Sequence, residues 1–179
     1  MSKTDRVHFQ RLLFRTAFCI MACDGEIEDR EINEIRYMND HAAYFSGVDL
    51  SEELDGLLDD LKEKGRFIVR DLLNSLEQMD LSTVQELLVL EVAFRVASAD
   101  DRLDENEVKL IRILRSKLNL HDPTILDRFG HISYLFDPEY ASTAISQDID
   151  LGYSSTFSMP DKKQLAQLNF RINPDEWYR

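Results

Sequence analysis

The stretch AFCIMACDGEIEDREINEIRYM, residues 17–38, returns in altered form as AFRVASADDRLDENEVKLIRIL, residues 93–114. The two stretches align without a gap at an offset of 76 residues, with Ala, Phe, Asp, Glu, Ile and Arg recurring in register. Each has the pattern of an apolar helix, an acidic turn and an amphipathic helix. Because neither hairpin alone can bury both of its helices, the sequence predicts that the two copies pack into one core.

Helical patterns continue through most of the remaining chain. Apolar spacing, capping residues and the scarcity of Gly and Pro favour helices over a turn-rich β fold. We expect an all-α protein, a single bundle of about seven helices built from two similar helical-hairpin halves, plus a C-terminal extension. The expected helices lie near residues 5–23, 29–44, 51–65, 66–79, 83–97, 104–118 and 125–129.

The pattern changes after Gly130. Residues 137–158 are rich in Ser, Thr, Asp and Tyr without a clear period, and a last short helix is expected over 159–168. We therefore expect residues 1–130 to form the helical domain. Residues 131–179 would form an extension that packs on this domain or contacts a partner.

Composition narrows the class of protein. The chain has 179 residues, 44% of them hydrophobic, and its 34 acidic and 21 basic residues give a net charge of −13. This charge argues against direct nucleic-acid binding through a broad basic face and against docking on an anionic membrane. No signal peptide and no transmembrane run are evident, and the two cysteines, Cys19 and Cys23, fit a reducing compartment. We expect a cytoplasmic protein without membrane insertion.

The two acidic turns are the candidate functional site. Hard divalent cations prefer several oxygen ligands from short acidic loops. An EF-hand ending at Glu31 is excluded, because its first and third ligand positions would fall on Ile20 and Ala22. The hypothesis is a site of another design for a divalent ion such as Ca²⁺, Mg²⁺ or Zn²⁺. Its core ligands would be Asp24, Glu31, Asp100 and Glu107, with Glu28 and Asp104 as secondary candidates.

Helix capping offers a structural explanation for part of this set. Asp104 fits an N-cap with Glu107 at the third helical position, and Glu31 occupies the equivalent position in the first copy. Acidic residues in a first turn also complement the helix dipole, by about 0.3–1 kcal/mol each. Asp24 and Asp100 instead follow the C-terminal ends of helices, where the dipole disfavours negative charge. A local turn, a basic side chain or a bound cation would have to compensate.

At these residues the chain resembles the TerB-like family, which comprises the TerB tellurite-resistance proteins and related domains. The resemblance is carried by ACDGEIEDRE around Asp24 and more weakly by SADDRLDENE around Asp100, and it spans roughly residues 8–130. It implies an all-helical bundle of about seven helices made of two similar halves. It also implies a cytoplasmic bacterial protein of tellurite resistance, chemical stress response or antiviral (phage) defence.

The same resemblance implies an acidic, metal-binding surface and work in multi-protein assemblies. By position, Asp24 and Glu31 match the first motif, and Asp100 and Glu107 match the second. Asp101 replaces the usual glycine of the second turn.

Catalytic motifs are missing from the sequence. It has no Gly-rich phosphate loop, no nucleophile elbow and no HExxH, so we expect no enzyme. The two cysteines lie on one helix face and are expected in the core, with binding of a soft metal as the alternative. Arginines at helical spacing, such as Arg66 with Arg70, are expected on a solvated face, with an anion contact as the alternative.

The expected function is therefore binding. We expect a noncatalytic, TerB-like protein of a bacterial stress (tellurite) resistance or phage-defence system. It would bind a divalent cation at its two acidic turns and other proteins of a resistance or defence complex. The sequence leaves a homodimer open. The alternative is a pure adaptor or scaffold in which the acidic turns are only helix-capping structure.

Overall fold

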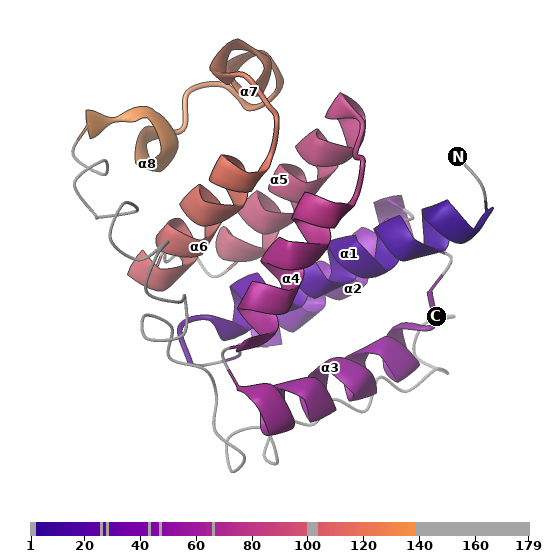
Figure 1. Cartoon of the computed structure of the whole chain (residues 1–179). Coiled ribbons are helices and arrows are strands. Elements are labelled where there is room, and N and C mark those ends of the chain that lie inside the picture. The colour runs from indigo at the N-terminus through magenta and orange to yellow at the C-terminus, as the bar shows by residue number, and fades with distance from the viewer. Residues whose placement is uncertain are drawn as a thin grey trace.

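A computed structural model of the chain describes residues 3–25, 27, 29–42, 44–46, 48–65, 67–99 and 104–138. In these residues there are eight α-helices and no strand, which confirms the all-α prediction (Figure 1). The short helix predicted over 159–168 lies outside the described residues. The helices are α1 (Lys3–Ala22), α2 (Asp29–Ala42), α3 (Leu50–Lys64), α4 (Phe67–Gln78), α5 (Thr83–Ala97), α6 (Glu105–Lys117), α7 (Asp122–Phe129) and α8 (Ser133–Phe136).

Helix α1 forms the centre of the bundle. It packs against α3, α4, α5 and α6. Between Leu12 and Cys23 every side chain except that of Arg15 is buried. A helix that is apolar on nearly all sides can fold only where neighbours cover it all round, so this composition places α1 in the core. Helix α5 is its main neighbour and is buried in the same way, with Val92, Ala93 and Val96 at 0% exposure.

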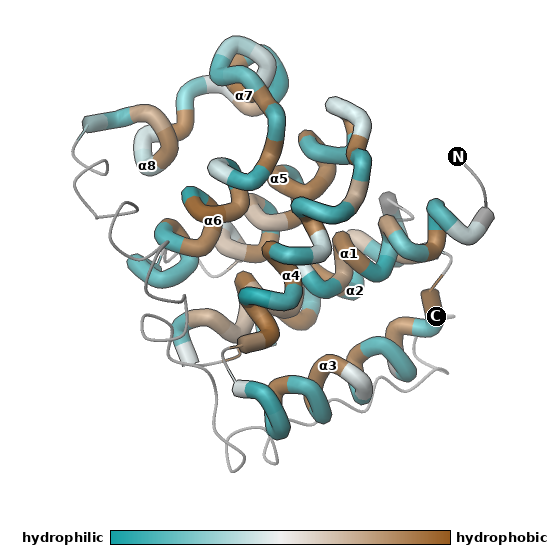
Figure 2. Tube along the Cα trace, in the orientation of Figure 1, coloured by the Kyte–Doolittle hydropathy of each residue, from teal (hydrophilic) through white to brown (hydrophobic). Residues whose placement is uncertain are grey.

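Helices α3 and α4 form a second layer on one side of α1. Helix α4 packs against α1, α3 and α6, and α3 packs against α1 and α4. The hydrophobic residues of α3 lie on its side toward α1 and α4, and hydrophilic residues lie on the opposite side (Figure 2). This one-sided pattern is what a helix at the surface of a bundle requires.

The described chain continues beyond the expected domain boundary at residue 130. Phe94 of α5 makes edge-to-face contacts with Phe129 of α7 and Tyr134 of α8, with ring centroids 5.1 and 6.2 Å apart. Leu135 and Phe136 also pack against the core. Helix α8 therefore belongs to the packed body. In the described part of the chain, no helix combines the length and the apolar character needed to cross a membrane.

Candidate functional site: an acidic corner at the end of α1

The structure describes four of the six candidate ligands. Asp24 is half-buried just after α1, and Asp104 is half-buried just before α6. Glu31 and Glu107 are buried, with only 6% and 5% of each residue exposed. Asp100 and Glu28 lie outside the described residues.

Glu31 and Glu107 occupy matching places in the structure. Helix α2 begins at Asp29 and α6 begins at Glu105, which are 76 residues apart, so each glutamate is the third residue of its helix. Burial of a carboxylate is costly unless polar groups compensate for the lost hydration. Two buried glutamates at the same helical position therefore indicate a local polar environment around each helix start.

For Glu107 that environment is a capping box. The backbone N–H of Asp104 donates to Glu107 Oε2 at 2.9 Å, and the N–H of Asn106 donates to Asp104 Oδ1 at 2.7 Å. Together these contacts satisfy backbone donors that the first turn of α6 leaves without helical partners. The predicted capping arrangement of Asp104 and Glu107 is confirmed.

The thiol of Cys23 lies where the two acidic turns come together. It is buried and donates to the carbonyl oxygen of Ile20 at 3.1 Å. Burial raises its pKa well above the ordinary value, and the negative charges of Glu107, Asp24 and Asp104 raise it further. Coulomb interactions fall with distance, so these three carboxylates lie close enough to Cys23 for their charges to act on its thiol. Asp24 belongs to the first turn and Asp104 and Glu107 to the second, so both turns contribute to one acidic corner.

Helix α8 lies beside the same corner. Burial raises the pKa of Tyr134 to about 12, and the charge of Glu107 adds to this effect. Arg112 of α6 donates through Nη1 to the carbonyl oxygen of Tyr134 at 2.9 Å, which ties α8 to α6. The corner is thus formed by the end of α1, the start of α6 and α8.

No three His, Cys, Asp or Glu side chains in the described residues are placed to hold one metal ion. One oxygen of Glu107 is already taken by the Asp104 amide. This observation does not include Asp100, which follows α5 in the sequence and is not among the described residues. Burial raises the pKa of the Cys19 thiol to about 12 and that of Cys23 well above its ordinary value, so both thiols are protonated at neutral pH. Both are free and fully buried, as expected for core residues.

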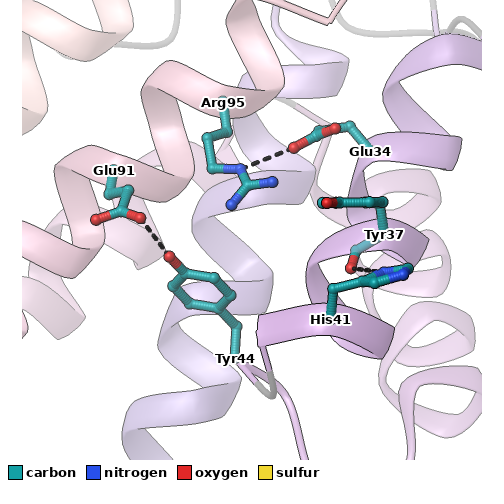
Figure 3. Close-up of polar contacts among 6 residues, drawn as sticks. All are labelled: Glu34, Tyr37, His41, Tyr44, Glu91 and Arg95. Carbon is teal, nitrogen blue, oxygen red and sulfur yellow. Dashed lines mark hydrogen bonds and ion pairs between the residues drawn. The ribbon is translucent and has the colours of Figure 1, made fainter.

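The structure also contains a group of polar contacts between α2 and α5, here called the polar seam, that was not predicted from the sequence (Figure 3). Its residues are Glu34, Tyr37, His41, Tyr44, Glu91 and Arg95. Arg95 Nε donates to Glu34 Oε1 at 2.8 Å, and the Tyr44 hydroxyl donates to Glu91 Oε1 at 2.5 Å. Burial and the hydrogen bond to Glu91 raise the pKa of Tyr44. The signal was present, because Glu91 and Arg95 lie one turn apart in the otherwise apolar stretch from Leu87 to Ala97 of α5. Their partners lie 47 and 61 residues away in sequence, and nothing local identifies them.

Aromatic and charged groups extend this seam to the surface. The rings of Tyr37 and His41 stack with their centroids 4.1 Å apart, and Tyr37 is 50% exposed. The Arg95 guanidinium lies 5.6 Å from the centroid of the Tyr37 ring, within the range of a cation–π contact. On the other side, Arg128 of α7 pairs with Glu91 at 2.6 Å.

Comparisons with protein-family models, with curated proteins and with solved structures each found no match to this chain. The resemblance to the TerB-like family therefore stays a prediction based on the two motifs.

Proposed function

We propose that this protein is a noncatalytic, TerB-like cytoplasmic protein of a bacterial stress-resistance or defence system, which binds a divalent cation at the acidic corner. The observation that carries the proposal is that Asp24 of the first turn and Asp104 and Glu107 of the second all act electrostatically on one thiol, that of Cys23. Several carboxylates in one partly buried place repel one another, and a hard cation relieves that repulsion. In this proposal, other proteins of the system bind elsewhere on the surface, and nucleic acid is not a direct ligand.

The proposal includes the descent of both hairpins from one unit. Support comes from a second pair of buried polar residues at the same offset of 76, Gln10 of α1 and Glu86 of α5. Gln10 Nε2 donates to Ser46 Oγ at 3.1 Å, and Glu86 Oε1 accepts from the Asn119 amide N–H at 2.8 Å. In each half, a buried polar side chain in the first half of the core helix thus holds the turn that follows the amphipathic helix.

Asp24 and Asp100 are the central ligands in this proposal. Each follows the C-terminal end of a core helix, where the partial negative charge of the carbonyls adds to that of the carboxylate. Glu107, whose Oε2 accepts from the Asp104 amide, would be a further carboxylate ligand. An all-carboxylate set favours Ca²⁺ or Mg²⁺, because Zn²⁺ prefers nitrogen and sulfur ligands.

The alternative is an adaptor in which the acidic turns serve only the fold. The capping box at α6 favours it, because this box gives Asp104 and Glu107 a complete structural role. An adaptor would bind its partners equally well with and without divalent ions. Its acidic corner would still stabilise the starts of the amphipathic helices.

Calorimetric titration separates the two functions. Ca²⁺, Mg²⁺ and Zn²⁺ are titrated into the wild type, Asp24→Ala, Asp100→Ala and a control, Asp59→Ala. Asp59 lies on the exposed face of α3, where it pairs with Lys62, so its variant loses the same charge far from the corner. We expect saturable heat in the wild type and the control, and its loss in the other two variants. Absence of saturable heat in the wild type would leave the adaptor as the function.

A further inference from the structure

A cavity of about 380 Å³ lies between the first half of α1 and the layer formed by α3 and α4. Its size is within the range of about 300–1,000 Å³ that is typical of small-molecule sites. Helix α1 supplies most of its charged groups. The lining residues are His8, Arg11, Leu12, Arg15, Glu53, Ser75, Gln78 and Met79.

Positive charge gathers in this cavity, although the chain as a whole carries −13. Its lining contains two guanidinium groups, of Arg11 and Arg15, and a single carboxylate, of Glu53. Glu53 pairs with Arg11 at 2.6 Å. The lining therefore keeps a positive balance even when His8 is neutral.

Arg15 is the second arginine of the lining, and it takes no part in the ion pair between Arg11 and Glu53. Its guanidinium forms no hydrogen bond or ion pair with another residue in the described part of the chain, and its side chain is half-buried. The charges of Arg15 and of Asp71 on α4 both act on the Cys19 thiol. Asp71 is already 3.5 Å from the ammonium group of Lys64. A half-buried arginine without an anionic partner is suited to an anion from outside.

The other lining groups suggest the shape of that anion. Leu12 and Met79 provide apolar surface, and the Gln78 amide provides a further hydrogen-bond donor. We propose that this cavity binds a small organic anion, a carboxylate or a phosphate monoester on a compact apolar body. The Arg15 guanidinium holds the anionic group, and Leu12 and Met79 contact the apolar part. Glu53 competes with the ligand for Arg11 and so limits the affinity.

This site is separate from the acidic corner. The cavity residues of α1 lie between His8 and Arg15, whereas the corner begins after Ala22 at the other end of the helix. One site attracts anions and the other attracts cations. Failure of either proposal therefore leaves the other intact.

The test measures binding of two anionic probes to the full chain by calorimetry. Benzoate and phenyl phosphate present a carboxylate and a phosphate on the same ring, and benzyl alcohol is the neutral counterpart. We expect saturable binding of at least one anion and none of the alcohol. The preferred anion identifies the head group of the natural ligand.

Three variants test whether the anion binds in this cavity. For each variant, the helical circular dichroism and the unfolding temperature show whether the chain still folds. Arg15→Gln should weaken anion binding by at least about tenfold, since it removes a charge-assisted contact. Glu53→Gln should strengthen binding, because it releases Arg11. Arg70→Gln, which removes an exposed arginine on α4 that lies over Phe67, should bind like the wild type.

Two results would overturn the proposal. One is the absence of saturable binding of both anions to the wild type. The other is unchanged affinity in a folded Arg15→Gln variant, which would place any anion contact outside this cavity.

Discussion

The two seams between the hairpins differ in chemistry although equivalent positions form them. In the apolar seam, where α1 packs on α6, Cys19 and Leu110 are both fully buried. In the polar seam, where α5 packs on α2, the residues at the same offset are Arg95 and Glu34, which form a half-buried ion pair. Helix α4 packs against both α1 and α6 and so covers the apolar seam.

The position of α4 accounts for this difference. Because α4 covers one seam, the residues of that seam lose contact with water, which favours apolar side chains there. The polar seam keeps side chains that interact with both water and protein, such as Tyr37 and Arg95. Burial stabilises the apolar seam, whereas a partly exposed ion pair contributes only about 0–1 kcal/mol. Substitutions in the polar seam should therefore cost less stability than substitutions in the apolar seam.

The largest expected effect is on the free energy of unfolding, when residues at equivalent positions of the two seams are replaced by alanine. Leu110→Ala removes a fully buried side chain from the apolar seam and should lower the free energy of unfolding by about 2–5 kcal/mol. Glu34→Ala, at the equivalent position of the polar seam, should cost at most about 1 kcal/mol. Urea denaturation measures both. Equal losses would show that the seams do not differ in the way described.

The buried thiol of Cys19 in the apolar seam should make stability depend on pH. Burial raises the pKa of Cys19 to about 12 from 9.0, so the folded protein holds a proton that the unfolded chain releases. The stabilisation is complete below about pH 9 and declines as the pH rises toward 12, by roughly 1 kcal/mol per pH unit. We expect the free energy of unfolding of Cys19→Ala to fall less steeply than that of the wild type between pH 8.5 and 10.5. Parallel slopes would mean that this thiol is accessible to water.

Within the polar seam, the hydroxyl of Tyr44 provides the smallest expected effect. Tyr44→Phe removes its hydrogen bond to Glu91 and should lower the free energy of unfolding by about 1 kcal/mol. The matched control is Tyr37→Phe, at a half-exposed ring whose stacking on His41 is kept, with an expected change within about 0.5 kcal/mol. Thermal unfolding of the two variants side by side measures the difference. A larger loss for Tyr37→Phe would reverse the assigned roles.

The helices could be predicted from the sequence because their signals are local. Asp104 with Glu107 defined the start of α6, and the apolar run after Leu12 placed α1 in the core. Helix α8 was missed because its four residues provide no periodic pattern. The pairing of Arg95 with Glu34 was also missed, since it depends on how distant helices pack.

The candidate site could likewise be predicted only where its signals are local. The capping role of Glu107 follows from residues three positions apart, and the sequence predicted it. The approach of both turns to Cys23 follows from the packing of α1 on α6, which no local pattern encodes. The cationic cavity was missed for a related reason. His8, Arg11 and Arg15 form one face of α1, but Glu53 and the α4 residues that complete the cavity come from elsewhere in the chain.

In the proposed function the two acidic turns bind one cation together. The most direct measurement is the number of Ca²⁺ or Mg²⁺ ions bound per chain in the wild type, in Asp24→Ala, in Asp100→Ala and in the double variant. A joint site predicts one ion in the wild type and none in either single variant, with no further change in the double variant. Two ions in the wild type with one left in each single variant, or no bound ion at all, would contradict it.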